Sequence, residues 1–390
     1  MSRSPQAVVV GAGMIGAVHA AAVRAAGGTL RGVVASTPER SARVAEEWDV
    51  PTRYPDFEAV LADDSVEVVH ICTPNAHHVR QTEAALAAGK HVICEKPLAT
   101  SAADAERLHR LADRAGLVLA VPFVYRYHPL VREIRDRRLN GEFGAWQLIH
   151  GSYLQDWMLS ESTVSWRVDP DAGGPSRAFA DIGSHWCDLV EWVAGVRFTE
   201  VTARVGTTIA TRPAGTGASF GAAGQGAPAG EGPVPRVPVR TEDVATVLLR
   251  TADGVLGTLT VSQVSAGRKN RLWFELDGAS GSAVFDQENP ETAWLGAQDG
   301  ARVLVRDPNH GSPEQRRLSR LPAGHAQGYA DCFNAFVADT YAAIDGGAPE
   351  GLPTGADGAR SARLVEAVLR SAASLTWTNV ETATSQETIV

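Results

Sequence analysis

The sequence predicts an α/β protein in which a doubly wound parallel sheet is followed by an α+β domain with a large open, mostly antiparallel sheet. Two patterns support this fold class. Up to residue 124, short apolar strands alternate with helical stretches, as in right-handed βαβ crossovers. Beyond residue 125, apolar and polar residues alternate with a period of two, and hairpin turns such as Thr251-Ala-Asp-Gly254 separate the strands.

Residues 5–124 are predicted to form the first domain, because strands and helices alternate strictly there. The strands are expected at Ala7–Val10, Leu30–Ala35, Val66–Cys72, Val92–Glu95 and Val118–Pro122. The helices are expected at Met14–Ala26, Pro38–Trp48, His77–Ala88 and Ala102–Ala115. Such a sheet binds ligands at the carboxyl ends of its strands.

Residues 125–377 are predicted to form the second domain, with 206–238 as a long loop rich in Gly, Ala and Pro and 378–390 as a polar tail. The expected helices are Leu130–Leu139, Ser184–Val193, Tyr329–Ile344 and Ala356–Ala373. The expected strands are Trp146–Leu154, Val201–Val205, Val244–Thr251, Val255–Val264, Arg271–Leu276 and Ser282–Asp286, the last five read as antiparallel. Because one face of this sheet stays open, we expect a homodimer or homotetramer.

The composition excludes several classes of protein. A chain of 390 residues, 44% of them hydrophobic, can form two sizeable cores. Its formal net charge of -9 disfavours a nucleic-acid partner. No apolar run approaches the roughly 20 residues of a membrane span, and the first six residues are too short and polar for a secretory signal. We therefore expect a cytoplasmic protein without a membrane partner.

A glycine-rich turn, Gly11-x-Gly13-x-x-Gly16, lies between the first strand and the first helix. In that context the backbone N–H groups, including those of Met14 and Ile15, and the helix N-terminus bind a pyrophosphate. The turn therefore predicts a bound dinucleotide.

The end of the second predicted strand bears on which dinucleotide is bound. NAD-binding folds place an acidic side chain there, whereas this chain has Ala35 followed by Ser36, Thr37 and, further on, Arg40. Two hydroxyls and a guanidinium suit a 2′-phosphate, so we expect NAD(P) with NADP modestly favoured over NAD. The alternative is that Ser36 and Thr37 cap the next helix and Arg40 is solvated.

Two further segments follow strands whose carboxyl ends border the expected cofactor site. Thr73-Pro74-Asn75 follows the third strand, with His78 on the next helix as a further contact or a surface histidine. Glu95-Lys96-Pro97 follows the fourth strand. A lysine at this edge would lie beside the nicotinamide and suggests hydroxyl or carbonyl chemistry.

These segments, together with Asp181-Ile-Gly-Ser-His185, resemble the Gfo/Idh/MocA oxidoreductase family over nearly the whole chain. The resemblance implies an N-terminal Rossmann domain, hydride transfer with NAD(P), and sugar or cyclitol substrates. Within the family, residues 151–157 and 165–167 resemble the branch containing levoglucosan dehydrogenase and C-glycoside 3-dehydrogenases. Val124 stands where the family often has Asn, and Ala35 replaces its usual acid.

Lys96, Asp181 and His185 are the candidate catalytic residues. A neutral imidazole at His185 would accept the proton of a substrate hydroxyl, and Asp181 would fix its tautomer or hold a neighbouring hydroxyl. Lys96 would stabilise the developing alkoxide or act as the base itself. The alternative is a structural pair with Asp181 as helix cap. Asp181 and His185 could together hold a divalent metal, but His150 and Cys187 make no convincing third ligand. The four cysteines include no Cys-x-x-Cys pair, so we expect no metal.

The substrate is expected to be a small carbohydrate, because hydrogen-bonding groups and aromatic rings gather near the start of the second domain. Tyr153, Gln155 and Trp157 share one parity if the strand continues that far. Further expected substrate contacts are Tyr125, Arg126 and His325, and expected contacts near the nicotinamide are Trp166, Arg167, Glu95 and Lys96. Each of these residues is also compatible with ordinary packing.

Three hypotheses about function follow. The first is an NAD(P)-dependent dehydrogenase of a ring hydroxyl in a sugar, glycoside or cyclitol. The second is a glycoside hydrolase that uses tightly bound NAD for transient oxidation. The third is a non-catalytic dinucleotide sensor, which the presence of both Lys96 and His185 disfavours.

Overall fold

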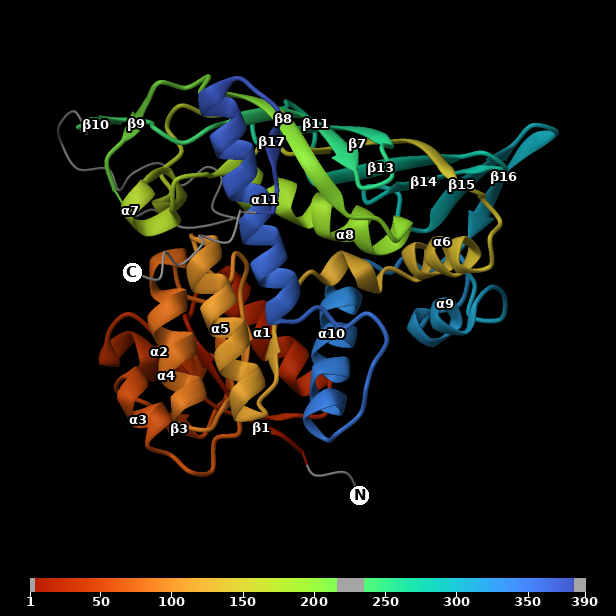
Figure 1. Cartoon of the computed structure of the whole chain (residues 1–390). Coiled ribbons are helices and arrows are strands. Elements are labelled where there is room, and N and C mark those ends of the chain that lie inside the picture. Colours follow the sequence, from red (N-terminus) through yellow and green to blue (C-terminus); the bar gives the residue numbers. More distant parts are fainter. Residues whose placement is uncertain (1–3, 216–234, 382–390) are drawn as a thin grey trace, which may run out of the picture.

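The first sheet is entirely parallel, with strand order β3-β2-β1-β4-β5-β6 in a computed structural model that describes residues 4–215 and 235–381 (Figure 1). Its strands are β1 (Gln6–Val10), β2 (Thr29–Val34), β3 (Thr52–Arg53), β4 (Val68–Ile71), β5 (His91–Cys94) and β6 (Leu119–Ala120). The strand order reverses at β1, which lies between β2 and β4. The carboxyl ends of β1 and β4 therefore form the switch point at which such sheets bind ligands.

The helices of this region match the sequence expectation closely. They are α1 (Met14–Ala25), α2 (Pro38–Glu47), α3 (Phe57–Leu61), α4 (His78–Ala87), preceded by η1 (Asn75–His77), and α5 (Ala102–Ala115). β3 and α3 were not predicted, because two and five residues are too few to show a period. The predicted Rossmann-type doubly wound sheet is confirmed.

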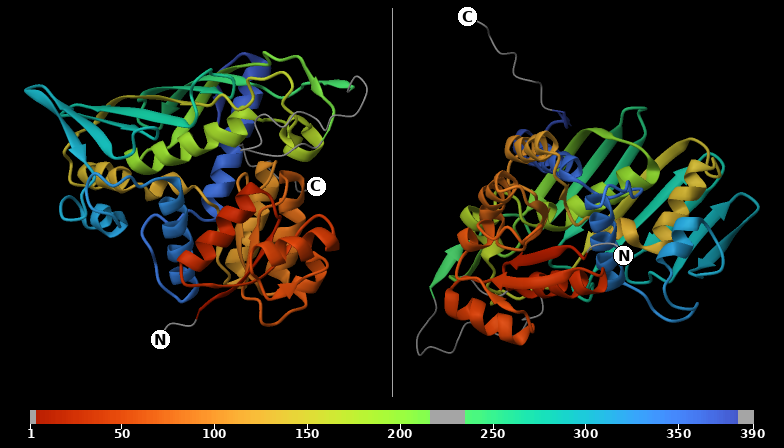
Figure 2. Two further views of the ribbon diagram at one scale, coloured as in Figure 1. Left: turned by 180° about the vertical axis from the view of Figure 1, so that it is seen from behind. Right: turned by 90° about the horizontal axis from the view of Figure 1, so that it is seen from below.

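A helix from the C-terminal part of the chain completes the core of the first sheet. α10 (Tyr329–Ile344) contributes Phe333, Phe336 and Tyr341 to the hydrophobic cluster that contains Val9 of β1. Figures 1 and 2 show α10, in blue, beside α1 at the side of the parallel sheet. The chain thus returns to the first domain after building the second.

The second sheet has nine strands in the order β16-β15-β14-β13-β7-β12-β11-β8-β17. They are β7 (Trp146–Leu154), β8 (Phe198–Gly206), β11 (Val244–Thr251), β12 (Leu256–Ser262), β13 (Arg271–Gly278), β14 (Ser282–Asp286), β15 (Thr292–Ala297), β16 (Gly300–Val305) and β17 (Thr378–Asn379). The prediction of a large, mostly antiparallel sheet is confirmed. The expectation that β12 is antiparallel is confirmed for its pairing with β11 but is wrong for its pairing with β7, which is parallel.

Helices cover one face of this sheet. Figure 1 shows α6 (Pro129–Leu139), α8 (Ser184–Ala194) and α11 (Gly355–Ser374) between the large sheet and the first domain, and no described helix lies on the opposite face. The right-hand view of Figure 2 shows the broad sheet extending beyond these helices. The helix-covered face of the large sheet is therefore the one that faces the first domain.

Several short elements depart from the expectation. β15, β16, β17 and α9 (Pro313–Leu318) were not predicted, and the loop expected at 206–238 contains β9 (Thr211–Pro213) paired with β10 (Arg236–Pro238). The middle of that loop, 216–234, lies outside the described residues, as does most of the expected tail. β17 lies within the predicted tail and pairs with β8, which gives this edge strand a partner.

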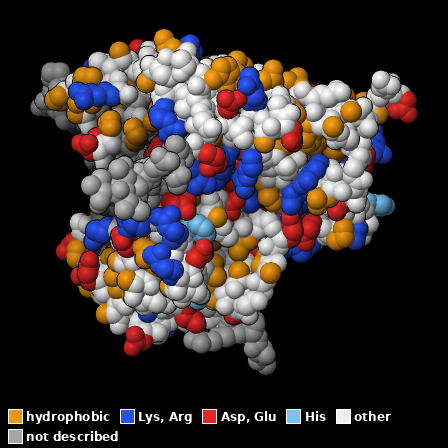
Figure 3. Space-filling model, in the orientation of Figure 1, with side chains coloured by type: hydrophobic (Ala, Val, Ile, Leu, Met, Phe, Trp, Pro, Cys, Tyr) orange, Lys and Arg blue, Asp and Glu red, His pale blue; other side chains and the backbone are white. Residues whose placement is uncertain are grey.

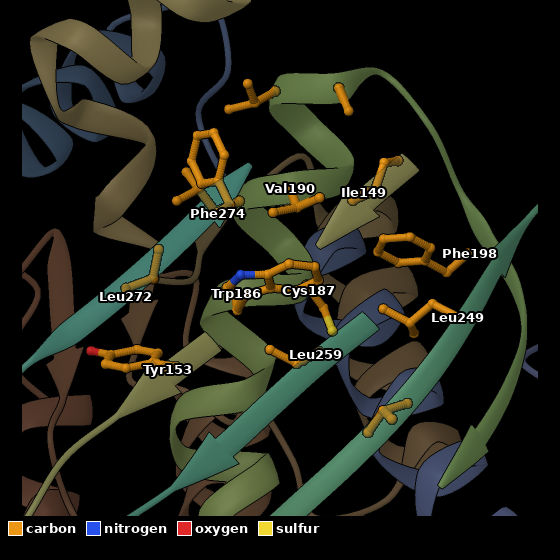
Figure 4. Close-up of a cluster of buried hydrophobic side chains, with 14 of the residues drawn as sticks. Ile149, Tyr153, Trp186, Cys187, Val190, Phe198, Leu249, Leu259, Leu272 and Phe274 are labelled. Carbon is orange, nitrogen blue, oxygen red and sulfur yellow. The ribbon is translucent and has the colours of Figure 1, made fainter. Parts of the chain in front are cut away.

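The core beneath the large sheet is centred on Trp186 of α8, which is fully buried (Figure 4). Its Nε1 donates a hydrogen bond of 2.9 Å to the carbonyl of Trp273 on β13. A Cβ at Gly151 of β7 would lie 2.4 Å from that Nε1 and 2.2 Å from the same carbonyl. Only glycine leaves room for the indole, so this packing fixes α8 and its N-terminal extension against the sheet.

Charged side chains of both signs lie on the surface drawn in Figure 3. On the face drawn in Figure 3, Lys and Arg side chains are interspersed with Asp and Glu rather than gathered into one basic patch. Of the helices in the described part of the chain, none is long and apolar enough to cross a bilayer.

Candidate active site

An ion pair between the two domains forms the centre of the site. Lys96 follows β5, and its Nζ donates to Oδ1 of Asp181 at 2.6 Å and to the Asp181 carbonyl at 2.8 Å. Both side chains are largely buried. An ammonium group has three N–H donors, so Asp181 accounts for two and leaves one available for a ligand.

Asp181 lies on a π-helix, η4 (Phe179–Gly183), that continues directly into α8 and His185. π-Helical turns inside helices are frequent at functional sites. The N–H groups that begin this turn are capped by Glu242, whose Oε1 accepts from the backbone of Arg177 and Phe179. The carboxylate of Asp181 is therefore directed to Lys96 and is no helix cap.

Two more side chains surround the Asp181 carboxylate. Gln263 donates from Nε2 to Oδ2 at 2.8 Å, and Nε of Arg167 lies 3.7 Å from Oδ1. Burial raises the pKa of Asp181, but the charges of Lys96 and Arg167 outweigh it and hold the pKa below the ordinary value for a carboxyl. Asp181 is therefore a carboxylate over the whole physiological range.

His185 lies in an aromatic pocket beside this ion pair. Its ring meets those of Phe123 and Tyr125 edge to face, with centroids 5.6 and 5.1 Å away. Its Nδ1 is buried and has no hydrogen-bond partner among the described residues. Burial and the charge of Lys96 lower the pKa of His185 well below 6.5, against the opposing effect of Asp181. The imidazole is therefore neutral near pH 7 and able to accept a proton.

A ladder of polar side chains extends from His185 along the end of β7. The hydroxyls of Tyr125 and Tyr153 are 2.6 Å apart, and Oδ1 of Asn270 accepts from Tyr153 at 2.6 Å and from Gln155 at 2.9 Å. The indole of Trp157 donates to Oε1 of Gln155 at 2.9 Å. β7 ends at Leu154, so the strand does not continue far enough for the expected shared parity, but these hydrogen bonds join Tyr153, Gln155 and Trp157 nonetheless.

Sequence reasoning missed Gln263 and Asn270. Both lie next to strand ends, Gln263 after β12 and Asn270 before β13. Because β12 runs parallel to β7 and β13 runs antiparallel to it, these residues meet Gln155 at the same edge of the sheet. Strands read as all antiparallel would have placed Gln263 at the far edge, so the pairing was the missing signal.

The glycine turn fits a dinucleotide. Gly11 has a φ of 108°, and a Cβ there would lie 2.4 Å from the carbonyl of Cys72 after β4. A Cβ at Gly16 would lie 2.0 Å from the carbonyl of Gly11. Gly13 begins α1 without a side-chain cap among the described residues, and the first turn, with Met14 and Ile15, carries no acid. The N–H groups of α1 are thus open to an anion.

Beyond β2, Thr37 caps α2 by accepting from the N–H of Arg40, as the alternative reading of this segment expected. The exposed guanidinium of Arg40 reaches back over the glycine turn and donates to the carbonyl of Ala12 at 3.3 Å. Ser36 is exposed beside it. The segment therefore presents a cation and a hydroxyl near the turn, with Ala35 at the end of β2 and one carboxylate, Glu39, in the first turn of α2.

Thr73, Pro74 and Asn75 follow β4 at the switch point. Thr73 donates from Oγ1 to Gln81 at 2.6 Å, and Asn75 donates from Nδ2 to the carbonyl of Gly173 at 2.8 Å, which joins the domains. Pro74 begins η1. Their contact with a cofactor stays a prediction.

Two predicted cofactor contacts are buried and have polar partners inside the first domain, and their contact with a cofactor stays a prediction. His78 is fully buried, and its ring nitrogens lie 2.7 Å from the carbonyl of Pro97 and 2.9 Å from that of Thr73. Glu95 is also buried and accepts from the N–H of Lys96 at 3.1 Å. The nearest polar partners of both residues lie in the interior of the domain. His78 and Glu95 therefore stabilise the segments that follow β4 and β5.

Two predicted substrate contacts, Arg126 and His325, have polar partners outside the group formed by Lys96, Asp181 and His185. The guanidinium of Arg126 in η2 (Val124–Tyr127) forms buried ion pairs with Asp188 and Asp357, so its charge is already compensated. His325 is exposed on the loop before α10, and its carbonyl accepts from Arg306 at 2.7 Å. Among the described residues, neither side chain forms a hydrogen bond or ion pair with Lys96, Asp181 or His185, and the contact of each with a substrate stays a prediction.

Trp166 and Arg167 lie in η3 (Trp166–Val168) and reach the site through Arg167. The guanidinium carbon of Arg167 lies 4.4 Å from the centre of the Trp166 ring and 5.7 Å from that of Trp157. Its buried Nη1 has no hydrogen-bond partner in the described part of the chain. Arg167 thus contributes positive charge beside Asp181, while a contact of either residue with nicotinamide stays a prediction.

The state of His185 is testable without turnover. We expect its ring to stay neutral through the pH range in which an ordinary histidine, with a pKa of about 6.5, becomes protonated, because burial and the charge of Lys96 lower its pKa. Lys96→Met removes a cation that lowers this pKa, so protonation should then occur at higher pH. Histidine ¹⁵N NMR titration measures both, with the exposed Lys269→Met as control. An unchanged titration of His185 in Lys96→Met would contradict the conclusion that the charge of Lys96 lowers the pKa of His185.

Two family models match the chain. One, described as an oxidoreductase family with an NAD-binding Rossmann fold, covers residues 6–123, and the GFO/IDH/MocA C-terminal domain covers residues 131–284. The levoglucosan dehydrogenase of Pseudarthrobacter phenanthrenivorans is 32% identical over 360 residues, which cover 90% of this chain and 90% of that protein.

Solved structures agree with this match. An oxidoreductase domain protein from Kribbella flavida is similar with a TM-score of 0.86 and 31% identity, covering 97% of this chain and 99% of its own. A levoglucosan dehydrogenase in complex with NADH and levoglucosan has a TM-score of 0.86 at 27% identity, covering 97% of this chain and 100% of its own. This chain is therefore an NAD-binding oxidoreductase and belongs to the Gfo/Idh/MocA family.

Proposed function

We propose that this protein oxidises, reversibly, a ring hydroxyl of a sugar, glycoside or cyclitol. The observation that carries this proposal is the unpartnered, buried Nδ1 of a neutral His185 beside the Lys96–Asp181 ion pair. A proton acceptor and a cation, both held in a largely buried pocket, are what the oxidation of a secondary alcohol requires. Similar proteins include a levoglucosan dehydrogenase and a 1,5-anhydro-D-fructose reductase.

In the proposed mechanism, His185 accepts the hydroxyl proton while the remaining N–H of Lys96 stabilises the developing alkoxide. Asp181 keeps Lys96 charged and fixes its position, because two of the three ammonium donors bind this one residue. A bound nicotinamide would accept the hydride, and in the reverse direction would supply it. The aromatic rings around His185 exclude water from the proton transfer.

The polar ladder is the proposed surface for the carbohydrate ring. Tyr125, Tyr153, Gln155 and Asn270 offer donors and acceptors that can exchange their mutual hydrogen bonds for those of sugar hydroxyls. The indole of Trp157 supplies an aromatic face at the end of the ladder. The site would distinguish strongly between sugars that differ in one hydroxyl, because a missing hydroxyl would leave a buried polar group of the protein unpaired, which is costly.

The first experiment measures reduced nicotinamide formed by the purified protein from NAD or NADP with a panel of pyranoses, glycosides, anhydrosugars and inositols. Lys96→Ala and His185→Ala should each lower kcat by about 100-fold or more. Their affinity for the cofactor, measured by quenching of protein fluorescence, should change less than about threefold, because neither residue forms the glycine turn.

His310→Ala serves as the control, since this side chain is 81% exposed. Near wild-type rates in Lys96→Ala or His185→Ala would remove that residue from the mechanism. Release of an aglycone without net reduced nicotinamide would favour the glycoside hydrolase instead. Cofactor binding without turnover of any substrate would favour the sensor.

We also propose that NADP is preferred over NAD. Arg40 and Ser36 are exposed beside the glycine turn, and Ala35 occupies the end of β2, where an acid would bind the ribose of NAD. Ala35→Asp should lower the ratio of kcat/KM for NADP to that for NAD by about tenfold or more, because its carboxylate would repel a 2′-phosphate and bind a 2′-hydroxyl. Ala35→Asn is the isosteric uncharged control. An unchanged ratio in Ala35→Asp, or a wild-type preference for NAD, would refute the NADP assignment.

We propose, finally, that the protein forms a homodimer or homotetramer through the open face of the large sheet. Apolar side chains are exposed on this face, at Leu148, Leu248, Leu256, Trp294, Val303 and Val305. A surface of this kind on a sheet face is typical of subunit contacts.

Leu256→Asp should therefore reduce the mass measured by light scattering, because it would bury a charge in the contact. Leu139→Asp, on the exposed end of α6, is the control. A monomeric wild-type protein, or an unchanged oligomer in Leu256→Asp, would argue against this interface.

A further inference from the structure

A continuous chain of hydrogen-bonding side chains crosses the interior of the first domain and ends at Glu95. The hydroxyl of Tyr341 lies 3.1 Å from Nε2 of His70, and Nδ1 of His70 lies 2.9 Å from Nδ1 of His19. Nε2 of His19 lies 3.1 Å from Oε1 of Glu95. Both histidines are fully buried, and Tyr341 and Glu95 are 4% and 8% exposed.

The four side chains of this hydrogen-bonded series come from segments that are distant in sequence. His19 lies on α1, His70 on β4, Tyr341 on α10, and Glu95 directly after β5. The Phe333 ring of α10 also packs against His19, with centroids 4.7 Å apart. The helix that returns from the second domain therefore fixes both ends of the histidine pair.

The proton count shows how the chain is connected. A carboxylate only accepts hydrogen bonds, so Nε2 of His19 carries a proton and donates to Glu95. With both rings neutral, His70 donates from Nδ1 to Nδ1 of His19, and Tyr341 donates to Nε2 of His70. Every ring nitrogen and hydroxyl in the chain is then paired, as buried polar groups require. The second oxygen of Glu95 accepts from the backbone N–H of Lys96 at 3.1 Å.

We propose that Tyr341, His70 and His19 are positioning residues that act through Glu95: they fix its carboxylate against the Lys96 backbone and so hold Lys96 toward Asp181 and the substrate. This inference rests on the proposed dehydrogenase function. It deepens that function by assigning a task to a buried cluster that never touches the substrate. Lys96 is the residue in common, because its backbone meets Glu95 and its ammonium meets Asp181.

Charge is part of the arrangement. Burial raises the pKa of Glu95, but the hydrogen bond from His19 and the charge of Lys96 act against it, and the pKa lies below its ordinary value. The titratable groups that interact with Glu95 are His19 on α1, Cys72 after β4, His78 on α4, Cys94 on β5, Lys96, and Tyr329 on α10. Only His19 donates a side-chain hydrogen bond to it within the described part of the chain.

Removal of that donor should therefore raise the pKa of Glu95, and the carboxyl would then be protonated at a pH at which the wild type is ionised. Because the carboxylate form predominates only above its pKa, activity that needs the Glu95 carboxylate is present above that pKa and is lost as the pH falls through it. The acidic limb of the kcat profile should move to higher pH.

The test compares His19→Phe with His19→Gln, whose amide nitrogen can replace Nε2 as donor to Glu95. At pH 6.5, His19→Phe should lose about tenfold or more in kcat, with cofactor affinity within about threefold of wild type, and should regain activity toward pH 9. His19→Gln should stay within about threefold of wild type at all pH values. His91→Phe, at the other end of β5, is the control, since His91 accepts from the backbone of Val118 at 3.0 Å.

A second readout is independent of activity. Long-range ¹⁵N NMR of histidine should show Nε2 of His19 protonated, and ¹³C NMR of labelled glutamate should show a higher pKa for Glu95 in His19→Phe. If His19→Phe does not fold, Tyr341→Phe, which removes one hydroxyl, should shift the His70 resonances and lower kcat in the same direction.

An unprotonated Nε2 in His19, an unchanged pH profile in His19→Phe, or equal losses in His19→Phe and His19→Gln would overturn the proposal. Failure of the wild type to turn over any sugar would instead refute the dehydrogenase function. The NMR result would still decide whether the hydrogen bonds from Tyr341 through His70 and His19 to Glu95 are formed.

Discussion

The ion pair between Lys96 and Asp181 is the interaction on which the rest of the site depends. It joins the end of a parallel strand in the first domain to a π-helical turn in the second, so one contact fixes the cleft and its charge together. Exposed ion pairs contribute little, but this pair is largely buried and Gln263 also binds the carboxylate. Loss of either partner would leave an uncompensated charge at the point where the chemistry is proposed.

The environment of this pair separates the roles of its neighbours. Positive charge from Lys96 and Arg167 keeps Asp181 ionised, while burial and Lys96 keep His185 neutral. A carboxylate and a neutral base thus coexist four residues apart on one continuous helical segment. Two ionisable groups whose pKa values are driven apart by their surroundings are the usual basis for assigning acid and base functions.

The C-terminal helices hold the two domains in this relation. α10 packs in the core of the first sheet, and Asp357 of α11 shares the buried Arg126 with Asp188 of α8. Burial raises the pKa of Asp188 to about 7, against the influence of Arg126, so this contact is held at an energetic cost that the surrounding packing has to offset. Through Asp188, Arg126 also supports the helix that carries His185.

The sequence by itself determined the strands and helices with strong periodicity, the glycine turn, and the three residues Lys96, Asp181 and His185, because each depends on local pattern or on short spacing. The tertiary structure decided what depends on pairing between distant segments. Parallel pairing of β7 with β12 brought Gln263 to the site, and antiparallel pairing of β7 with β13 brought Asn270. Packing of α1 and α10 placed His19 against Glu95 and beneath Phe333. Direction of pairing and burial are properties of the packed chain, since each is set by partners far apart in the sequence.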